Sequence, residues 1–412
     1  MLLSPFHLLL LLQLTLYTSA EQLSVPIFSA FSKYGEYYLN ISIGSTSLSQ
    51  TFRVQIDTGS SDLGIPESGC TTCNKHTDRR YTPHDSSTAS VINCTHESLP
   101  DLVCHPCHHH SQCAMTISYE DDSGFEADLW MDQVAFEAER TIYVDAVVAG
   151  LYKDHRRNPM QPTSIDGILG LAYQSESSAN TRTPLDYLIA SSATKLDDVF
   201  ALCLDSKDGG VMKIGSPPGD PFYASHHNVI QWSPLLNKTF YPVNMTSFYV
   251  GPHRLNVEPA VYTRGDAIID SGSTDITLPR AAFDAFRNLM VAQCHQGNDL
   301  VGICHDESGH KIQPGGGMFQ SLCYSLTTTQ IQAFPILYVH LGDNVSLPIS
   351  PNIYVRGGAS YCDDPKQVTL GIDSGAVADG TLLGDIFMES YFTVFDRTHQ
   401  RIGFAPADQF CE

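Results

Sequence analysis

One ten-residue phrase occurs twice in this chain, once in each half. The first copy, DTGSSDLGIP, runs from Asp57 to Pro66, and the second, DSGSTDITLP, runs from Asp270 to Pro279. Each follows an apolar-rich run, as expected where a strand delivers a carboxylate to a glycine-containing turn. Two such phrases, both extended to a proline, are not a chance match to average composition. The pattern predicts two related halves that each supply one carboxylate.

The repeat continues further along each half. An apolar-apolar-glycine triplet at residues 168–170 follows the first acid, and a second at residues 382–384 follows the second acid at nearly the same spacing. Two halves with this pattern predict a pseudo-two-fold pair of lobes that meet at Asp57 and Asp270.

A third D-S-G sequence begins at Asp373. Ala376 follows it where the pattern needs a hydroxyl residue, and Gly384 is too near for another lobe to fit between them. We interpret this segment as a loop.

The double motif resembles the pepsin-like aspartic proteases, which carry D-[TS]-G-[ST] and a later apolar-apolar-glycine triplet in each lobe. The resemblance covers nearly everything from Tyr34 to Cys411. It implies a mostly β, bilobal fold with an active-site cleft between the lobes, and a monomeric endopeptidase that acts on polypeptides without a cofactor or a metal. The alternative is an inactive binding or inhibitor relative on the same fold, which the presence of both acids with their Thr/Ser-Gly-Ser neighbours disfavours.

The resemblance also implies roles around each acid. Asp57 and Asp270 are the expected catalytic pair, because two adjacent carboxyls cannot both ionise and so share one proton. Thr58 and Ser271 are expected to hydrogen-bond across the lobe interface. The other supporting residues, which bring backbone N–H groups or hydroxyls to the carboxylates, are Gly59, Ser60, Gly272 and Ser273.

A flap is expected to close over the acids. Residues 117–124 resemble the flap tip of the family, with Tyr119 as the flap tyrosine and acids in place of the usual glycines. Gly64 stands where many members carry a tryptophan that hydrogen-bonds this tyrosine. Either the flap acids contact substrate and attract Lys or Arg near the scissile bond, or they point to solvent. These acids are Glu120, Asp121 and Asp122.

The composition bounds the setting in which the chain works. Its 412 residues, 42% hydrophobic and 17% charged, suit one large or two ordinary globular domains. The formal net charge of −22 disfavours nucleic acid and anionic membranes as partners and suits an acidic compartment. Residues 1–20 resemble a secretory signal peptide, and no later stretch reaches the length of a membrane span. We expect a protein that is secreted or held in the lumen of an acidic secretory or endolysosomal compartment, without a membrane anchor.

Strand-like segments recur along the chain and helical patterns are few. The expected strands include residues 37–43, 115–119, 141–148, 336–341 and 391–395, and the expected helices are 184–190 and 280–292. Glycine and proline pairs cluster near residues 205–220. We therefore expect an N-terminal lobe at residues 21–205 and a C-terminal lobe at residues 206–412.

Twelve cysteines in a chain with a secretory signal indicate disulfides. Six lie in an insert, residues 70–113, which resembles the Cys-rich inserts of nepenthesins and plasmepsin V. Its C-x-x-C pairs and the histidines at 108–110 would also suit a zinc-stabilised binding module, but an oxidising lumen favours disulfides. Their pairing is not predictable from sequence. The insert cysteines are Cys70, Cys73, Cys94, Cys104, Cys107 and Cys113.

The remaining cysteines are assigned by resemblance. Beta-secretase-like enzymes imply the pair Cys203–Cys411, and the wider family implies Cys323–Cys362, which leaves Cys294 and Cys304 for each other. Five N-x-[ST] sequons agree with passage through a secretory lumen. The sequon asparagines are Asn40, Asn93, Asn237, Asn244 and Asn344.

Little chain precedes the first expected strand. Pepsin-like zymogens usually carry a basic prosegment of several tens of residues over the acidic cleft. Here Lys33 is the sole basic residue between Ala20 and Tyr37. We therefore expect the protein to be active after removal of the signal peptide alone.

Overall fold

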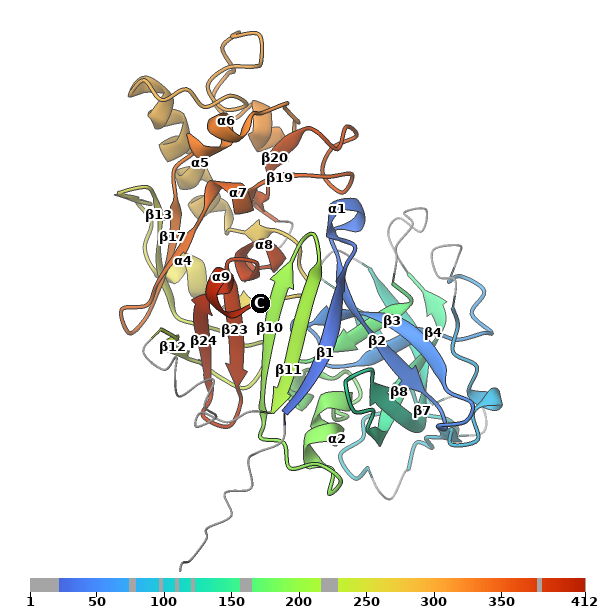
Figure 1. Ribbon diagram of the computed structural model, residues 1–412. Helices are drawn as coiled ribbons and strands as arrows, with labels where there is room; N and C mark the ends of the chain where they lie inside the picture. Colours follow the sequence, from blue (N-terminus) through green and yellow to red (C-terminus); the bar gives the residue numbers. More distant parts are fainter. Residues whose placement is uncertain are drawn as a thin grey trace, which may run out of the picture.

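The computed structural model describes most of the chain. The described residues are 22–73, 79–95, 99–107, 111–119, 123–155, 165–215, 229–375 and 380–411. They form two lobes, mostly of β-structure, joined by a sheet that both share (Figure 1). This confirms the expectation of a mostly β, bilobal fold. The expected signal peptide, the histidines at 108–110 and the flap acids at 120–122 lie outside the described residues.

Strands from both ends of the chain lie side by side in the shared sheet, where red and blue strands flank the green ones in Figure 1. In spatial order they are β12 (Gln231–Pro234), β24 (Arg401–Pro406), β23 (Tyr391–Asp396), β10 (Val199–Asp205), β11 (Gly209–Gly215) and β1 (Gln22–Ser29). Strand β1 pairs antiparallel with β11 and then with β2 (Tyr37–Ile43). The boundary expected after residue 205 falls in the turn between β10 and β11, inside this sheet.

The same small arrangement of strands occurs once in each half. In the first half, β3 (Gln50–Asp57) runs parallel to β9 (Gly167–Gly170), and β9 runs antiparallel to β4 (Leu63–Pro66). In the second half, β15 (Ala267–Ile269) runs parallel to β22 (Thr381–Leu383), and β22 runs antiparallel to β16 (Ile276–Thr277). The duplicated phrase includes the loop between the outer strands, which are β3 and β4 in the first half and β15 and β16 in the second. The apolar triplets form or end the central strands, β9 and β22. This repetition gives the molecule its pseudo-two-fold symmetry.

The other strands complete the lobes. In the N-terminal lobe they are β5 (Ser90–Val91), β6 (Ala114–Ser118), β7 (Gly124–Phe136) and β8 (Tyr143–Asp154). In the C-terminal lobe they are β13 (Met245–Val250), β14 (His253–Arg254), β17 (Leu337–Leu341), β18 (Ser346–Ile349), β19 (Val355–Gly357), β20 (Val368–Leu370) and β21 (Ile372–Asp373). The expected strands at 115–119, 141–148, 336–341 and 391–395 overlap β6, β8, β17 and β23.

Both expected helices are present. Helix α2 (Pro184–Ala190) begins with a capping box, in which the Thr183 hydroxyl accepts from the Asp186 N–H and the Asp186 carboxylate accepts from the Thr183 N–H. Helix α5 (Arg280–His295) extends three residues beyond the expected end. The short helices are α1 (Phe31–Tyr34), α4 (Ala260–Thr263), α6 (Thr328–Gln332), α7 (Pro351–Tyr354), α8 (Asp385–Met388) and α9 (Ala407–Phe410). The 3-10 turns are η1 (Pro83–Asp85), η3 (Gln174–Glu176) and η4 (Gly317–Gln320). None of the described helices is long and apolar enough to cross a membrane.

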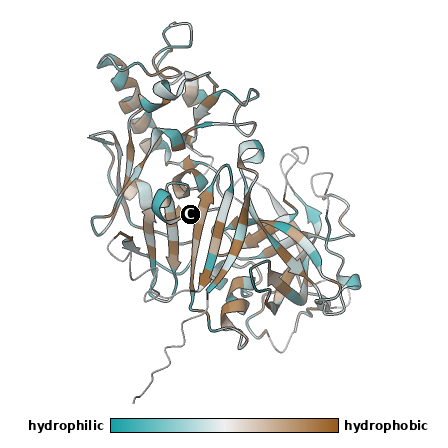
Figure 2. Cartoon of the chain, viewed as in Figure 1, coloured by the Kyte–Doolittle hydropathy of each residue, from teal (hydrophilic) through white to brown (hydrophobic). Residues whose placement is uncertain are grey.

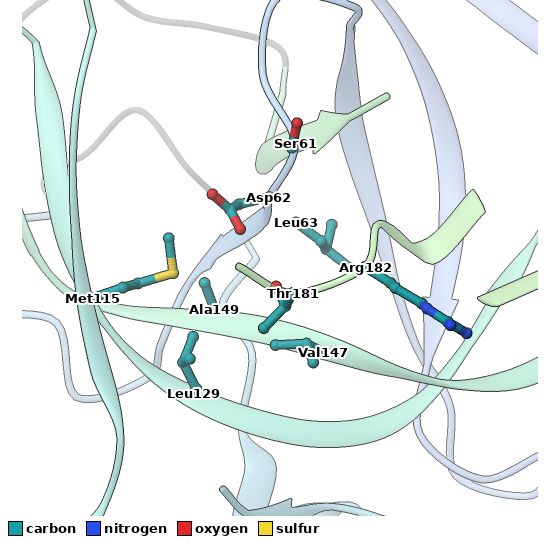
Figure 3. Close-up of a pocket in the computed structure, with 9 residues that line it drawn as sticks. All are labelled: Ser61, Asp62, Leu63, Met115, Leu129, Val147, Ala149, Thr181 and Arg182. Atoms are coloured by element: carbon teal, nitrogen blue, oxygen red, sulfur yellow. The ribbon is translucent and has the colours of Figure 1, made fainter. Parts of the chain in front are cut away.

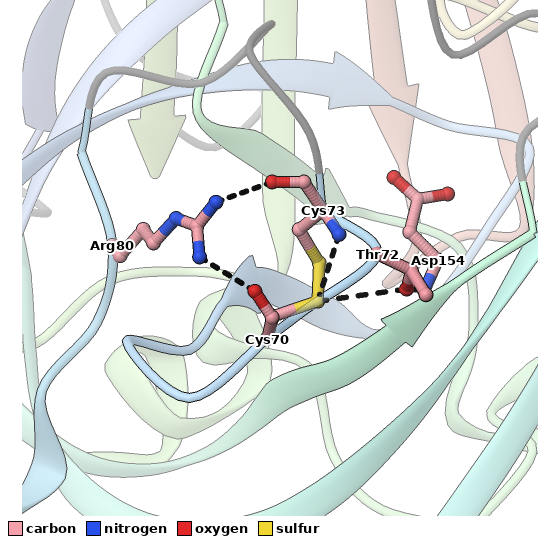
Figure 4. Close-up of a disulfide and its surroundings, with 5 residues drawn as sticks. All are labelled: Cys70, Thr72, Cys73, Arg80 and Asp154. Carbon is pink, nitrogen blue, oxygen red and sulfur yellow. Dashed lines mark hydrogen bonds between the residues drawn. A yellow bond between two sulfur atoms is a disulfide. The ribbon is translucent and has the colours of Figure 1, made fainter.

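Each cysteine of the chain is disulfide-bonded. The insert contains Cys70–Cys73, Cys94–Cys107 and Cys104–Cys113, and the remaining bonds are Cys203–Cys411, Cys294–Cys304 and Cys323–Cys362. Figure 4 shows how Arg80 stabilises the first of these, since its guanidinium donates to the carbonyl oxygens of Cys70 and Cys73. A cysteine held in a disulfide offers no thiolate for zinc, so these pairings support the disulfide interpretation of the insert.

The sequons lie on the surface with one exception. Asn40 is half-buried within β2, whereas the other four asparagines are exposed. At Asn237 the hydroxyl of Thr239 donates to the side-chain oxygen of the asparagine. The exposed sequon asparagines are Asn93, Asn237, Asn244 and Asn344.

One apolar cluster extends through both lobes, and the strands of the shared sheet are predominantly hydrophobic (Figure 2). Strand β1 contributes every second side chain to it, namely Leu23, Val25 and Ile27. The N-terminal strand is therefore part of the core rather than an appendage that the fold could lose.

We predict that Val25→Ala lowers the free energy of unfolding by about 2 kcal/mol, because it removes two buried methyl groups at the centre of the shared sheet. Urea denaturation of the purified protein measures this change. Ser24→Ala, on the other face of the same strand, is the control and should leave the midpoint nearly unchanged. Equal midpoints for Val25→Ala and the unsubstituted protein would contradict the assignment of β1 to the core.

Candidate active site

The strand repeat brings the two expected catalytic acids to equivalent places. Asp57 is the last residue of β3 and lies opposite Gly170 of β9 in the parallel ladder. Asp270 directly follows β15, and its N–H donates to the carbonyl oxygen of Leu383 in β22 (3.2 Å). Both side chains are buried, at 8% and 7% exposure. Each carboxyl therefore emerges where a buried strand enters its loop.

Each loop folds back to hydrogen-bond its own acid. The Gly59 N–H donates to Oδ1 of Asp57 (2.8 Å), and the Ser60 hydroxyl donates to Oδ2 (2.5 Å). The second loop repeats this geometry at Asp270, where the donors are the Gly272 N–H (2.9 Å) and the Ser273 hydroxyl (2.6 Å). These bonds fix the orientation of both carboxyls before any substrate arrives.

Thr58 and Ser271 tie the two loops together. The Thr58 hydroxyl donates to the carbonyl oxygen of Ile269 (2.8 Å) and accepts from the Ser271 N–H (2.9 Å). In reciprocal fashion, the Ser271 hydroxyl donates to the carbonyl oxygen of Ile56 (2.9 Å) and accepts from the Thr58 N–H (3.2 Å). Both side chains are almost completely buried. The structure thus places these residues across the interface in a closed set of hydrogen bonds.

The glycines of the two loops allow the acids to approach each other. A Cβ atom on Gly59 would lie 2.5 Å from Oδ1 of Asp270, and a Cβ atom on Gly272 would lie 2.2 Å from Oδ1 of Asp57. Neither distance is compatible with a side chain, so any other residue would push the opposite carboxyl away. Glycine is required here for the close approach of the two loops.

The electrostatics of the pair follow from this proximity. Burial raises the pKa of Asp57, and the neighbouring charge of Asp270 raises that pKa further. Burial also raises the pKa of Asp270, against the opposing effect of its hydrogen bonds from Ser273 and Gly272. Each carboxyl lies close to the loop that carries the other, near Gly59 and Gly272. The pair is therefore suited to hold one shared proton, with one neutral and one ionised member.

A second pair of acids repeats in the same phrase, and sequence reasoning missed its environment. Asp62 and Asp275 occupy the same position in the two copies of the phrase. Asp62 is buried, lines a small pocket with Met115 and Thr181 (Figure 3), and accepts from the Ser177 hydroxyl (2.7 Å) and the Ser178 N–H (3.2 Å). Asp275 accepts from the Tyr361 hydroxyl (2.6 Å). Desolvation by burial raises the pKa of each to about 6. Both copies of the phrase carry Asp at the sixth position, and this repetition is the sequence feature that could have predicted the second pair of acids.

A further buried carboxyl, Asp385, lies beside the second loop. It follows the second apolar triplet directly, is 0% exposed, and has no hydrogen-bond partner for either carboxyl oxygen among the described residues. Burial and the negative charges of Glu389 and Asp270 raise its pKa well above the usual range. Glu389 forms a buried ion pair with Arg356 (2.7 Å) and accepts from the Tyr37 hydroxyl (2.7 Å). The second loop therefore contacts a residue, Asp385, whose buried carboxyl favours the neutral form, since the Asp385 N–H donates to the Ser273 carbonyl oxygen (2.8 Å).

The structure also places the expected flap tyrosine and the third D-S-G. Tyr119 directly follows β6, at the end of the β6–β7 hairpin where the chain passes from one strand to the other, and Glu120, Asp121 and Asp122 fall outside the described residues. We expected the third D-S-G to lie in a loop. Its first residue, Asp373, instead ends the two-residue strand β21. Its exposed carboxylate accepts from the Thr277 hydroxyl (2.9 Å). Pairing with β16 accounts for the difference.

A cavity of about 480 Å³ adjoins the second loop. Thr274 and Asp275, which directly follow Ser273, form one wall, and Gly35 at the end of α1 lies beside them. The Thr274 hydroxyl donates to the Gly35 carbonyl oxygen (2.9 Å). The opposite wall comes from α5, with Phe283 among its residues. Space for a side chain therefore lies beside the residues that directly follow the second acid loop, and neither acid lines it.

We predict that the fold loses stability as the pH rises from about 4 to about 7. The pKa of Asp62 is about 6 in the folded protein and 3.8 in the unfolded chain. Between these values the folded state retains a proton that the unfolded state has released, so stability falls with rising pH. Asp62→Asn keeps an acceptor for Ser177 but cannot titrate. Over this pH range, the free energy of unfolding of Asp62→Asn should fall less than that of the unsubstituted protein. The difference between the two falls should reach up to about 3 kcal/mol.

Thermal or urea unfolding at pH 4 and pH 7 measures this difference. Asp145→Asn, an exposed position on β8, is the matched control and should follow the unsubstituted protein. An identical loss of stability in Asp62→Asn and in the unsubstituted protein would contradict the prediction.

Comparison with known proteins identifies the family. The model of the eukaryotic aspartyl protease family matches residues 36–100 and 105–407. The chain is 26% identical to a beta-secretase of Strongylocentrotus purpuratus, 25% identical to a gastricsin of Cavia porcellus and 26% identical to pepsin A of Bos taurus. Each alignment covers 90% of this chain, and they cover 66%, 80% and 84% of the respective relatives. The duplicated acid loops, the bilobal β-fold and this match together show that the chain belongs to the pepsin-like family of eukaryotic aspartyl proteases.

Proposed function

We propose that this chain is an aspartic-type endopeptidase in which Asp57 and Asp270 activate a water molecule for attack on a peptide bond. The observation that carries the proposal is the crossed arrangement of the two loops, which holds two buried carboxyls close enough for the charge of one to raise the pKa of the other. A pair that shares one proton supplies a base and an acid in the same place. Family membership supports the same general activity.

The chemistry follows from the two protonation states. The ionised acid takes a proton from the water, which attacks the scissile carbonyl carbon, while the neutral acid donates its proton to the carbonyl oxygen. A tetrahedral intermediate results. The carboxyl that gained the proton from water then protonates the amine as the C–N bond breaks. The other carboxyl, which is now ionised, takes a proton back from a hydroxyl of the intermediate as the new carboxyl product forms, so the pair again holds one proton. Ser60 and Ser273 hold the carboxyls in position throughout.

Several features support an acidic setting. The net charge of −22 decreases in magnitude as carboxylates protonate. The buried acids Asp62 and Asp275 favour the folded state most when they are neutral. With residues 1–20 as a signal peptide and six disulfides in the fold, we propose a secreted or lumenal enzyme of an acidic compartment. The cavity beside Thr274 is proposed to receive a side chain of the polypeptide substrate.

An inactive binding or inhibitor relative is the competing function. Such a protein needs the fold but not the shared proton, so it would not require the pair of glycines that the two carboxyls approach. In this chain both acids, both glycines and all four hydroxyl donors or acceptors around them are in place. This completeness favours the enzyme.

We predict that Asp57→Asn and Asp270→Asn each reduce peptide hydrolysis at acidic pH by at least about a thousandfold, because either amide removes the shared proton. Cleavage of a denatured protein substrate or a peptide library measures the loss. Asp145→Asn, at an exposed position on β8, is the matched control and should retain full activity. A folded Asp57→Asn or Asp270→Asn protein with near-normal turnover would refute the mechanism.

We also predict that the enzyme is active with its N-terminal strand intact. Strand β1 already occupies its place between β11 and β2, and the Ser360 hydroxyl donates to the carbonyl oxygen of Phe31 just beyond it (3.1 Å). N-terminal sequencing of the secreted, active protein should therefore give a start before Leu23. Activity that appears only after cleavage beyond Ile27 would contradict this expectation.

A further inference from the structure

An aromatic ring lies over Gly64, the second residue of β4. A Cβ atom on Gly64 would lie 2.8 Å from Cζ of Phe125 and 3.3 Å from Cδ1 of Leu151. No side chain fits at position 64 unless the Phe125 ring moves. Phe125 belongs to β7 and is only 4% exposed, so the ring is held within the apolar cluster of the N-terminal lobe.

The backbone does not require glycine at this position. Gly64 lies outside the left-handed region that favours glycine. The equivalent residue in the second copy of the phrase is Thr277, which carries a side chain and uses it to donate to Asp373. The two copies therefore differ at a place where the strand geometry accepts either residue. The space above Gly64 is explained by the ring of Phe125.

The same ring contacts the base of the flap. Phe125 pairs with Ile117 across the β6–β7 hairpin, and the N–H of Tyr119 donates to the carbonyl oxygen of Ser123 (2.8 Å) where the hairpin closes. The rings of Tyr119 and Phe125 are 6.2 Å apart between centroids and inclined at 55°. These values lie in the range of favourable aromatic pairs. Phe125 thus packs between the flap tyrosine and the strand that follows the first acid loop.

We propose that Phe125 is a positioning residue, which holds the ring of Tyr119 over the paired acids by packing against β4 in the space that glycine at position 64 leaves open. The inference rests on the proposed function, in which Tyr119 is the flap tyrosine. A tryptophan at position 64 would reach Tyr119 from the body of the lobe through a hydrogen bond. Here the contact comes from the flap hairpin itself and is apolar.

Phe125→Ala tests the proposal by kinetics. It should lower kcat/KM by about tenfold to a hundredfold, because a misplaced flap side chain costs catalytic alignment. In a Tyr119→Ala background the same substitution should have little further effect, since the ring that it positions is absent. Leu129→Ala, a buried residue of the same apolar cluster, is the matched control and should lower the melting temperature while leaving kcat/KM near normal. Equal losses from Phe125→Ala with and without Tyr119 would overturn the proposal.

A reciprocal exchange tests the spatial claim. Gly64→Trp alone should lower both the melting temperature and kcat/KM, because the indole and the Phe125 ring compete for one space. Adding Phe125→Ala to Gly64→Trp should recover part of both losses. Strictly additive losses in the double variant would show that the two residues do not share this space, and would overturn the inference.

A spectroscopic readout separates this inference from the proposed function. With 3-fluorotyrosine at position 119, the ¹⁹F resonance should shift or broaden in Phe125→Ala and remain unchanged in Leu129→Ala. This measurement needs no catalytic activity. If the unsubstituted protein cleaves no peptide but the resonance responds as expected, the proposed function fails and the packing assignment stands. An unchanged resonance in Phe125→Ala overturns the inference whatever the activity.

Discussion

The crossed hydrogen bonds between Thr58 and Ser271 are the constraint on which the rest of the molecule depends. Each hydroxyl donates to a backbone carbonyl of the opposite half and accepts from a backbone N–H. The four bonds are buried, so losing one partner would leave polar groups without water. They fix the distance between two lobes that otherwise share one sheet. At that distance, only glycine fits opposite each carboxyl, at Gly59 and Gly272.

Two buried carboxylates held this close would repel each other and would lack solvation by water. Protonation removes this cost, because a neutral carboxyl carries no charge. Burial raises the pKa of both members of the pair, and also that of Asp62, Asp275 and Asp385 around them. A buried carboxyl without a cationic partner is favourable only when neutral. The pKa of Glu389 is raised as well, although this acid is paired with Arg356. The fold therefore concentrates acids with raised pKa values around its centre, and the same property links stability and proposed catalysis to low pH.

The two halves use one phrase for different purposes at its eighth position. In the second half, Thr277 carries a hydroxyl that binds Asp373 and closes β16 against β21. In the first half, Gly64 leaves room for Phe125, so the flap hairpin packs directly on the strand behind the acid. The residue at this position therefore differs between the halves according to what packs on the strand. A duplicated scaffold can thus keep its catalytic loops symmetrical and change the neighbouring residue.

The sequence by itself determined the repeat, the mostly β bilobal fold and the acids that meet at its centre, because these depend on short patterns that each half repeats. Resemblance to the family supplied the partners that Cys203 and Cys323 have in the structure. Only the tertiary structure decided the pairing of the insert cysteines, the burial of Asp62 and Asp385, and the contact of Phe125 with Gly64. The insert cysteines lie close together in sequence, but each has several possible partners there. The burial of the acids and the contact of Phe125 with Gly64 are relations between segments far apart in the chain, and local composition carries no information on which of them lie in contact. The strand pairing sets those contacts, and with them the desolvation that alters the acids.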